Sequence, residues 1–237
     1  MNQTKITVGE LSVTQVTATE KPSAAVIFCH GFGAGGDDLV PLAAEMVRAD
    51  ESLQNVAFLF PAAPIDLDQG FDSRAWWPID MEKIQELAIK GEFRELKAES
   101  PAELPKCNEM IHGVIDFACS EFSLKRSKIV IGGFSQGSML TTDVALTLDE
   151  AVGGLIVWSG TVICEPRWTS LAGKHKFPVC QSHGTLDPIL PFAGAVDLCA
   201  LLTDAGLEVE FTEFDGPHTI PAAGLASAIK LIRKVAG

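Results

Sequence analysis

The sequence predicts an α/β fold, an open and mostly parallel doubly wound sheet that forms one domain over residues 1–237. Three observations indicate this fold. The chain has 237 residues and is 47% hydrophobic, which is enough for one large core. Short, nearly continuous apolar runs recur along it, as expected for parallel strands covered on both faces. Segments of helical length separate these runs, and this alternation is typical of strand–helix–strand units.

The expected strands begin with an antiparallel hairpin, because residues 4–8 and 11–17 alternate apolar and polar side chains around Gly9-Glu10. A final alternating run at residues 208–214 is expected near the edge of the sheet. Between them, five apolar runs predict parallel strands at residues 24–29, 56–60, 128–131, 154–158 and 177–181.

Helices are expected between these strands, at residues 38–49, 105–122, 135–148, 192–205 and 221–235. The second has the clearest helical period, with Met110, Val114, Ala118 and Phe122 on one apolar stripe. In sheets of this kind, ligands bind beyond the carboxyl ends of the strands.

The connection between residues 60 and 105 is too long for an ordinary loop in a compact domain. It contains Phe71, Trp76 and Trp77, and an amphipathic helix is expected from about Asp80 to Lys97. We interpret residues 66–104 as an insertion that forms a partial lid or a pocket wall. The alternative is an irregular surface excursion whose aromatic residues form a satellite core.

Composition excludes several function classes. The net charge of −13 disfavours nucleic acid and anionic lipid as partners, because both attract clustered Lys and Arg. No apolar run approaches the roughly 18 residues of a membrane span, and the first residues do not resemble a signal peptide. We therefore expect a cytoplasmic protein without stable membrane insertion. Its six scattered cysteines, none with metal-ligand spacing, are expected to be reduced thiols.

The segment Gly133-Phe134-Ser135-Gln136-Gly137 places a serine between two glycines, at a turn from an apolar strand into a helix. Such a turn holds the serine in a strained conformation that presents it as a nucleophile, and the glycines let the strand and the helix close on either side. The alternative is a Ser-Gly turn used only for its flexibility.

A serine hydroxyl is a weak nucleophile, so Ser135 needs an imidazole base and a carboxylate that orients the imidazole. His218 follows the last strand and Asp187 follows the strand before it, so both are expected at the same sheet edge as Ser135. The order Ser135, Asp187, His218 is that of α/β-hydrolases. His183 is the rival base and Asp215 the rival acid, but both fit the loop positions less well.

The glycine-rich stretch from His30 to Gly36 follows the strand at residues 24–29. It matches a dinucleotide-binding pattern, but Asp37 and Asp38 at the start of the next helix would repel a pyrophosphate. We interpret it as an oxyanion loop, with the backbone N–H groups of Phe32 and Gln136 as donors. Cys29 beside His30 is expected in the core, because neighbouring strand residues point to opposite faces.

Together these segments resemble the carboxylesterase and phospholipase family of α/β-hydrolases, which includes acyl-protein thioesterases and lysophospholipases. The matching segments are Cys29-His30-Gly31-Phe32-Gly33, Pro61-Ala62-Ala63-Pro64 with Trp76-Trp77-Pro78-Ile79-Asp80, Gly132-Gly133-Phe134-Ser135-Gln136-Gly137, His183-Gly184-Thr185-Leu186-Asp187-Pro188 and Gly216-Pro217-His218. The chain departs from better-known members at Ser138, where a glycine is common, and in its longer connection between Asp80 and Pro105.

The resemblance implies an α/β-hydrolase fold and a serine esterase that cleaves carboxylic esters or thioesters through an acyl-enzyme at Ser135. No metal or organic cofactor is expected. The substrate would be a small-molecule or acyl-chain ester bound near Phe71, Trp76, Trp77 and Ile163. The sequence leaves a homodimer open. The alternative function is a catalytically silent scaffold that binds a ligand or partner.

Overall fold

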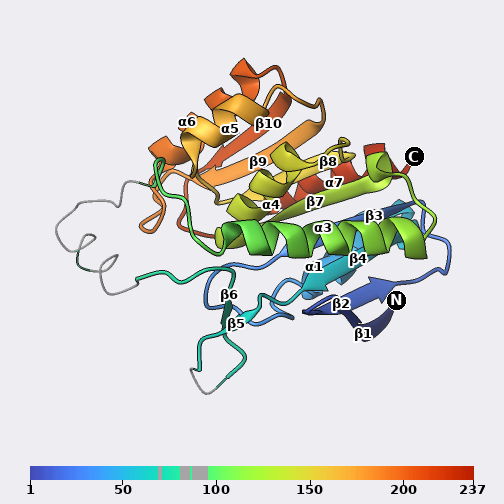
Figure 1. The fold of residues 1–237 in the computed structure, drawn as a ribbon. Helices are drawn as coiled ribbons and strands as arrows, with labels where there is room; N and C mark the ends of the chain where they lie inside the picture. Colours follow the sequence, from blue (N-terminus) through green and yellow to red (C-terminus); the bar gives the residue numbers. More distant parts are fainter. Residues whose placement is uncertain (69–70, 81–85, 87–95) are drawn as a thin grey trace.

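The computed structural model of the chain describes residues 1–68, 71–80, 86 and 96–237 (Figure 1). Within these residues the main sheet has eight strands in the order β1-β2-β4-β3-β7-β8-β9-β10. The strands are β1 (Asn2–Val8), β2 (Leu11–Thr17), β3 (Ala24–Cys29), β4 (Val56–Pro61), β7 (Ile129–Phe134), β8 (Gly154–Trp158), β9 (Pro178–Gly184) and β10 (Glu208–Phe214).

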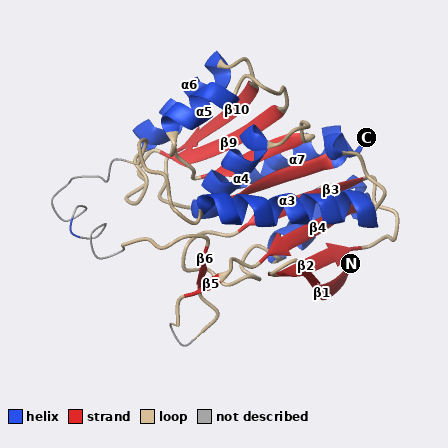
Figure 2. Cartoon of the chain, viewed as in Figure 1, coloured by secondary structure: helices blue, strands red, loops and turns tan. Residues whose placement is uncertain are grey.

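The sheet is mostly parallel, as predicted. Among the described strands of the main sheet, only the pairs β1–β2 and β2–β4 are antiparallel, so the expected N-terminal hairpin forms one end of the sheet. Beside it, β5 (Ile65–Asp66) and β6 (Arg74–Ala75) form a small separate ribbon that the sequence did not indicate (Figure 2).

Helices cover both faces of the sheet (Figures 1 and 2). They are α1 (Pro41–Ala49), α3 (Leu104–Glu121), α4 (Gln136–Thr147), α5 (Glu165–Leu171), α6 (Phe192–Asp204) and α7 (Ala222–Ala236). Short 3-10 turns are η1 (Glu51–Asn55) and η2 (Arg126–Lys128).

Strand β3 shows how one sheet serves two cores. Its side chains alternate between the faces, so Ala25, Ile27 and Cys29 join the core under α3, α4, α5 and α6. Ala24, Val26 and Phe28 join the second core, under α1 and α7. This division explains why the central strands are continuous apolar runs: every position faces a helix layer.

The element boundaries differ from the expected ones in local ways. Helix α1 begins at Pro41 rather than at residue 38, since proline suits the first turn of a helix. Helix α5 was not predicted; it is short, and Cys164 before it adopts a left-handed conformation with φ 49°. The helix expected from Asp80 to Lys97 lies outside the described residues apart from its ends. In the described parts of the chain, no helix has the length and apolar character that crossing a bilayer requires.

A buried carboxylate on α4 joins three helices. Asp143 is fully buried, and its Oδ1 accepts hydrogen bonds from a guanidinium nitrogen of Arg167 at 2.7 Å and from Trp168 Nε1 at 2.8 Å, both on α5. Its Oδ2 accepts a hydrogen bond from Asn108 Nδ2 on α3 at 2.6 Å. A buried charge is tolerated only when it is paired and hydrogen-bonded, and this cluster meets both conditions. It therefore fixes α4 against its neighbours.

Asp143→Ala should lower the free energy of unfolding by about 3 kcal/mol, because two buried donors, Asn108 and Trp168, and the half-buried Arg167 lose their acceptor. Urea denaturation of the variant measures this change. The control is Asp149→Ala, which removes a carboxylate that is fully exposed and pairs with Lys174 at 3.4 Å. Exposed pairs contribute little, so this variant should match the wild type. Equal stability of the two variants would show that the Asp143 cluster does not stabilise the fold.

Candidate active site

Ser135 lies at the turn between β7 and α4 and has a strained backbone, with φ 53° and ψ −118°. Non-glycine residues rarely adopt this conformation unless the surrounding structure enforces it. Ser135 precedes the first residue of α4, and its side chain does not cap the helix. The residue is half-buried at the carboxyl edge of the sheet, the position in which such turns present a nucleophile.

The two glycines of the turn allow this conformation by letting backbones approach closely. A Cβ on Gly133 would lie 2.7 Å from the carbonyl carbon of Gly137 and would also meet the carbonyl oxygen of Cys29. A Cβ on Gly137 would meet the carbonyl groups of Cys29 and His30 at the end of β3. No side chain fits at either position, so the serine turn depends on glycine at both.

The histidine and aspartate predicted for the site form a hydrogen-bonded pair. His218 Nδ1 lies 2.6 Å from Asp187 Oδ2, although the residues come from different loops, after β10 and after β9. Asp187 is 5% exposed, and its Oδ1 accepts the backbone N–H groups of Ile189 at 2.8 Å and Leu190 at 2.9 Å. The carboxylate is therefore held firmly in one orientation.

Backbone contacts join the two loops that carry this pair. The N–H groups of Thr185 and Leu186 donate to the carbonyl groups of Phe214 at 2.9 Å and Gly216 at 3.1 Å. Gly184 lies so close to the Gly216 carbonyl that a Cβ would overlap it. The acid loop and the histidine loop thus form one rigid unit.

Burial alone would raise the pKa of Asp187, but donors reverse this effect. Hydrogen bonds from His183 and His218, together with the N–H of Leu190, bring the pKa of this carboxyl well below its ordinary value. Asp187 is therefore ionised at neutral pH.

His218 lies directly beside the serine turn. Its ring centroid is 4.8 Å from that of Phe134, the residue before Ser135. The residue after it, Thr219, is anchored because its carbonyl accepts the Ser159 hydroxyl at 3.1 Å. Since Nδ1 bonds to Asp187, Nε2 is the ring nitrogen left for proton exchange with a serine. The structure therefore brings Ser135, Asp187 and His218 to one edge of the sheet.

The glycine-rich loop after β3 is held by the imidazole of His30. His30 Nδ1 lies 2.9 Å from Gly31 O, and its Nε2 accepts the N–H of Ala63 at 3.0 Å. Only a neutral ring protonated at Nδ1 makes both bonds. Burial lowers the pKa of His30, which favours this neutral form. A Cβ on Gly31 would lie 3.4 Å from Ser135 Cβ, so the loop runs beside the serine.

Two backbone N–H groups near the serine turn are available to donate hydrogen bonds. Gln136 is the first residue of α4, so its N–H has no acceptor within the helix. In the part of the chain that the structure describes, the N–H of Phe32 also meets no protein acceptor. The side chain of Gln136 is fully buried: its Oε1 accepts the N–H of Trp76 at 2.9 Å and its Nε2 donates to Trp77 O at 2.8 Å.

The residues predicted to contact substrate differ in how much of their side chains is exposed. Trp76, Trp77 and Ile163 are 0%, 5% and 2% exposed and belong to the core, and Trp76 Nε1 donates to His30 O at 2.9 Å. Their side chains thus brace the site in this structure, and contact with substrate stays a prediction. Phe71 is 68% exposed, in the connection between β5 and β6.

Sequence reasoning missed two exposed apolar residues beside the acid. Leu186 and Ile189 flank Asp187 and are 67% and 41% exposed. Their signal was available in the segment Leu186-Asp187-Pro188-Ile189-Leu190, since a loop with three aliphatic residues is unusual on a surface.

The other residues considered from the sequence as possible site residues have surroundings that suit other roles. His183 and Cys29 are fully buried, and burial raises the pKa of the Cys29 thiol well above its ordinary value. Asp215 is exposed, and Asp37 forms an ion pair with Lys5 at 2.8 Å. Across the described ranges, no three His, Cys, Asp or Glu side chains gather in a way that would hold a metal ion.

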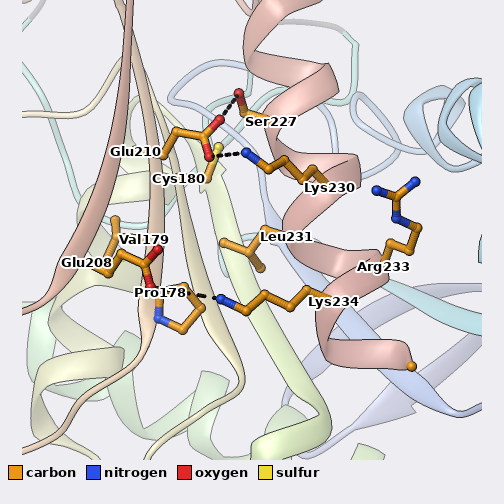
Figure 3. Close-up of a pocket in the computed structure, with 11 residues that line it drawn as sticks. Pro178, Val179, Cys180, Glu208, Glu210, Ser227, Lys230, Leu231, Arg233 and Lys234 are labelled. Atoms are coloured by element: carbon orange, nitrogen blue, oxygen red, sulfur yellow. Dashed lines mark hydrogen bonds and ion pairs between the residues drawn. The ribbon is translucent and has the colours of Figure 1, made fainter.

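A pocket of about 330 Å³ lies at the opposite edge of the sheet, between α7 and the first residues of β9 and β10 (Figure 3). Its charges neutralise one another: Glu210 accepts from Ser227 Oγ and Lys230 Nζ, both at 2.9 Å, and Lys234 lies 3.9 Å from Glu208 (Figure 3). Because the strands begin here and end at the catalytic loops, this pocket is separate from the site.

Known proteins with similar sequences include the acyl-protein thioesterase 1 of Candida albicans, which is 27% identical over 90% of this chain and 92% of its own. The acyl-protein thioesterase 1 of Debaryomyces hansenii is 28% identical, over 93% of this chain and 95% of its own. These matches extend over nearly the whole of each protein.

Solved structures with a similar fold were also found. Esterase PE8 has a similar fold, with a TM-score of 0.77 and 24% identity over 95% of this chain and 99% of its own. SOBER1 of Arabidopsis thaliana has a TM-score of 0.72 and 25% identity, over 90% of this chain and 98% of its own. A model of the phospholipase/carboxylesterase family matches residues 12–236, which include every element of the site described above. The chain therefore belongs to the phospholipase/carboxylesterase family of α/β-hydrolases.

Proposed function

We propose that this protein is a serine hydrolase that cleaves carboxylic esters or thioesters through an acyl-enzyme at Ser135. The observation that carries the proposal is the 2.6 Å contact between His218 Nδ1 and Asp187 Oδ2 beside a strained serine turn. Family membership and relatives named acyl-protein thioesterase support the same reaction.

In the proposed mechanism, Ser135 Oγ attacks the carbonyl carbon of the substrate while His218 Nε2 takes the hydroxyl proton. Asp187 keeps the imidazole in the tautomer with Nδ1–H and stabilises the imidazolium that forms. The negative charge on the former carbonyl oxygen is stabilised by the N–H groups of Phe32 and Gln136. His218 then protonates the leaving alcohol or thiol. Water, deprotonated by His218, attacks the acyl-enzyme, and the acid leaves as Ser135 regains its proton.

We propose an apolar acyl group for the substrate. Leu186 and Ile189 expose aliphatic side chains in the loop that carries Asp187, and this apolar surface would favour contact with an acyl chain. Phe71 adds an exposed aromatic ring. The residue after it, Asp72, accepts the N–H of Gly36 in the glycine-rich loop at 3.0 Å.

Two further expectations belong to this proposal. The chain acts as one domain, because both cores include residues of β2, β3, β4, β7, β8 and β9. A reducing compartment such as the cytoplasm suits its six free thiols, four of which are buried. Whether it forms a homodimer is decided by sedimentation velocity.

A fluorophosphonate should label the protein stoichiometrically at Ser135, and Ser135→Ala should abolish both labelling and ester hydrolysis. Labelling is measured by mass spectrometry of the intact protein and its peptides. Ser123→Ala is a matched control, since Ser123 also has a positive φ of 54° but lies at the end of α3. Full hydrolysis by folded Ser135→Ala protein would contradict the proposed function and favour a non-catalytic scaffold.

Gly31→Ala should lower kcat about 10- to 100-fold, because the new methyl group would lie 3.1 Å from Phe134 Cδ1 and displace the oxyanion loop or the serine turn. Steady-state kinetics with one ester measures the loss. Gly113→Ala adds the same methyl group on α3, where nothing lies within 4 Å. That variant should keep full activity and gain up to about 1 kcal/mol of stability. Normal kcat in Gly31→Ala would remove the loop from the mechanism.

With p-nitrophenyl esters, kcat/KM should rise from acetate to octanoate, by up to about fourfold per methylene while the chain contacts apolar surface. The double variant Leu186→Ser/Ile189→Ser should flatten this rise. Val196→Ser is its control, because Val196 is 42% exposed but lies on α6, beyond the acid loop. A profile that falls from acetate onward would contradict the proposed apolar acyl group.

A further inference from the structure

A second imidazole contacts the carboxylate that orients His218. His183 lies near the end of β9 with a fully buried side chain, and its Nε2 is 3.2 Å from Asp187 Oδ2. The same nitrogen is 2.9 Å from the carbonyl oxygen of Leu190. The catalytic mechanism described above does not use this residue.

The tautomer of His183 follows from its partners. A carbonyl oxygen only accepts hydrogen bonds, so Nε2 must carry a proton to bond with Leu190 O. This N–H bonds to Leu190 O, and Asp187 Oδ2 lies 3.2 Å from the same nitrogen. Nδ1 is buried and has no partner among the described residues, so a second proton there would be unsatisfied. The ring is therefore a neutral donor to Asp187.

With this donor, both oxygens of Asp187 are fully used. Oδ1 receives the N–H groups of Ile189 and Leu190, Oδ2 receives that of His218, and His183 Nε2 lies 3.2 Å from Oδ2. A carboxylate has about four acceptor positions. His183 therefore occupies the position on Oδ2 that His218 leaves, and prevents the carboxylate from turning.

The surroundings of the pair contain few other charges. On α6, the ring of Phe192 lies 6.2 Å from that of His183. On β10, Glu213 lies opposite His183 in the strand register, but it is exposed and its charge is screened by solvent. In the histidine loop, Asp215 is exposed as well. His218 and His183 are thus the ionisable groups in direct contact with Asp187.

We propose that His183 is a positioning residue for the hydrolytic reaction, which acts by donating its Nε2–H to Asp187 and so fixes the carboxylate that orients His218. This inference rests on the proposed function of Ser135, Asp187 and His218. The same contact also weakens the attraction between Asp187 and the His218 imidazolium. The His183 donor disperses part of the charge on Oδ2, so Asp187 holds the imidazolium less tightly than a bare carboxylate would.

The test compares His183→Leu, which removes the donor, with His183→Gln, whose side-chain NH₂ can occupy the place of Nε2. His183→Leu should lower kcat about tenfold or more with KM within about twofold, because a charge-assisted hydrogen bond is lost. The acid limb of its kcat/KM profile should move up by about half a pH unit, since the imidazolium of His218 is held more tightly. His183→Gln should restore most of both properties.

His112→Leu is the matched control. It removes a half-buried histidine on α3, away from the site, in which one ring nitrogen, Nε2, has no partner among the described residues, as Nδ1 has none in His183. A residue with only a structural role would lower the thermal midpoint without moving the acid limb. The positioning role is therefore wrong if folded His183→Leu has a normal kcat and acid limb, or if His183→Gln is as impaired as His183→Leu.

If His183→Leu fails to fold, ¹⁵N NMR of histidine-labelled wild-type protein still tests the assignment. His183 should have a protonated Nε2 and an unprotonated Nδ1 at neutral pH, because Leu190 O accepts from Nε2 and Nδ1 has no partner among the described residues. A ring protonated at Nδ1 alone could not donate to Asp187 and would overturn the proposal. Ser135→Ala, assayed in parallel, separates the two hypotheses: full activity in that variant contradicts the catalytic assignment, whereas an inactive Ser135→Ala with a normal His183→Leu contradicts only the role of His183.

Discussion

The close approach of α4 to the end of β3 is the constraint on which the site depends. Gly133 and Gly137 bring the serine turn against the carbonyl groups of Cys29 and His30, at distances that leave no room for a Cβ. This contact holds Ser135 at φ 53°, a conformation that the residue would not adopt alone. It also places the loop after β3 beside the serine. One backbone contact thus sets both the nucleophile and the N–H groups proposed to stabilise the oxyanion.

The polar groups at this edge serve more than one purpose. Gln136 offers its backbone N–H to the site while its side chain bonds to Trp76 and Trp77. His30 orders the glycine-rich loop through its ring, and its carbonyl accepts the Trp76 indole. Because these bonds are buried, breaking any one of them would leave polar atoms unsatisfied. Rigidity of the site is therefore a consequence of the core, and preorganised donors of this kind stabilise charge without having to reorient.

The sequence was sufficient for the parts of the molecule that are set by local pattern and by topology. Parallel strands appeared as apolar runs, and the loops after them necessarily met at one sheet edge, which predicted the pairing of Asp187 with His218. It was not sufficient where tertiary contacts decide. The sequence did not indicate that the backbone of Trp76 and Trp77 bonds to the side chain of Gln136, 60 residues from Trp76, or that both rings are buried. His183 appeared only as a rival base, because its contact with Asp187 depends on how the acid loop turns back toward β9.

The same contacts locate the ends of the insertion. At one end, Trp76 and Trp77 are bonded to Gln136. At the other, the carbonyl groups of Lys97 and Glu99 accept the N–H groups of Glu165 and Cys164, at 2.8 Å and 2.9 Å, and Lys97 Nζ pairs with Asp197 at 2.8 Å. Both ends are thus fixed to elements that border the serine turn or follow β8.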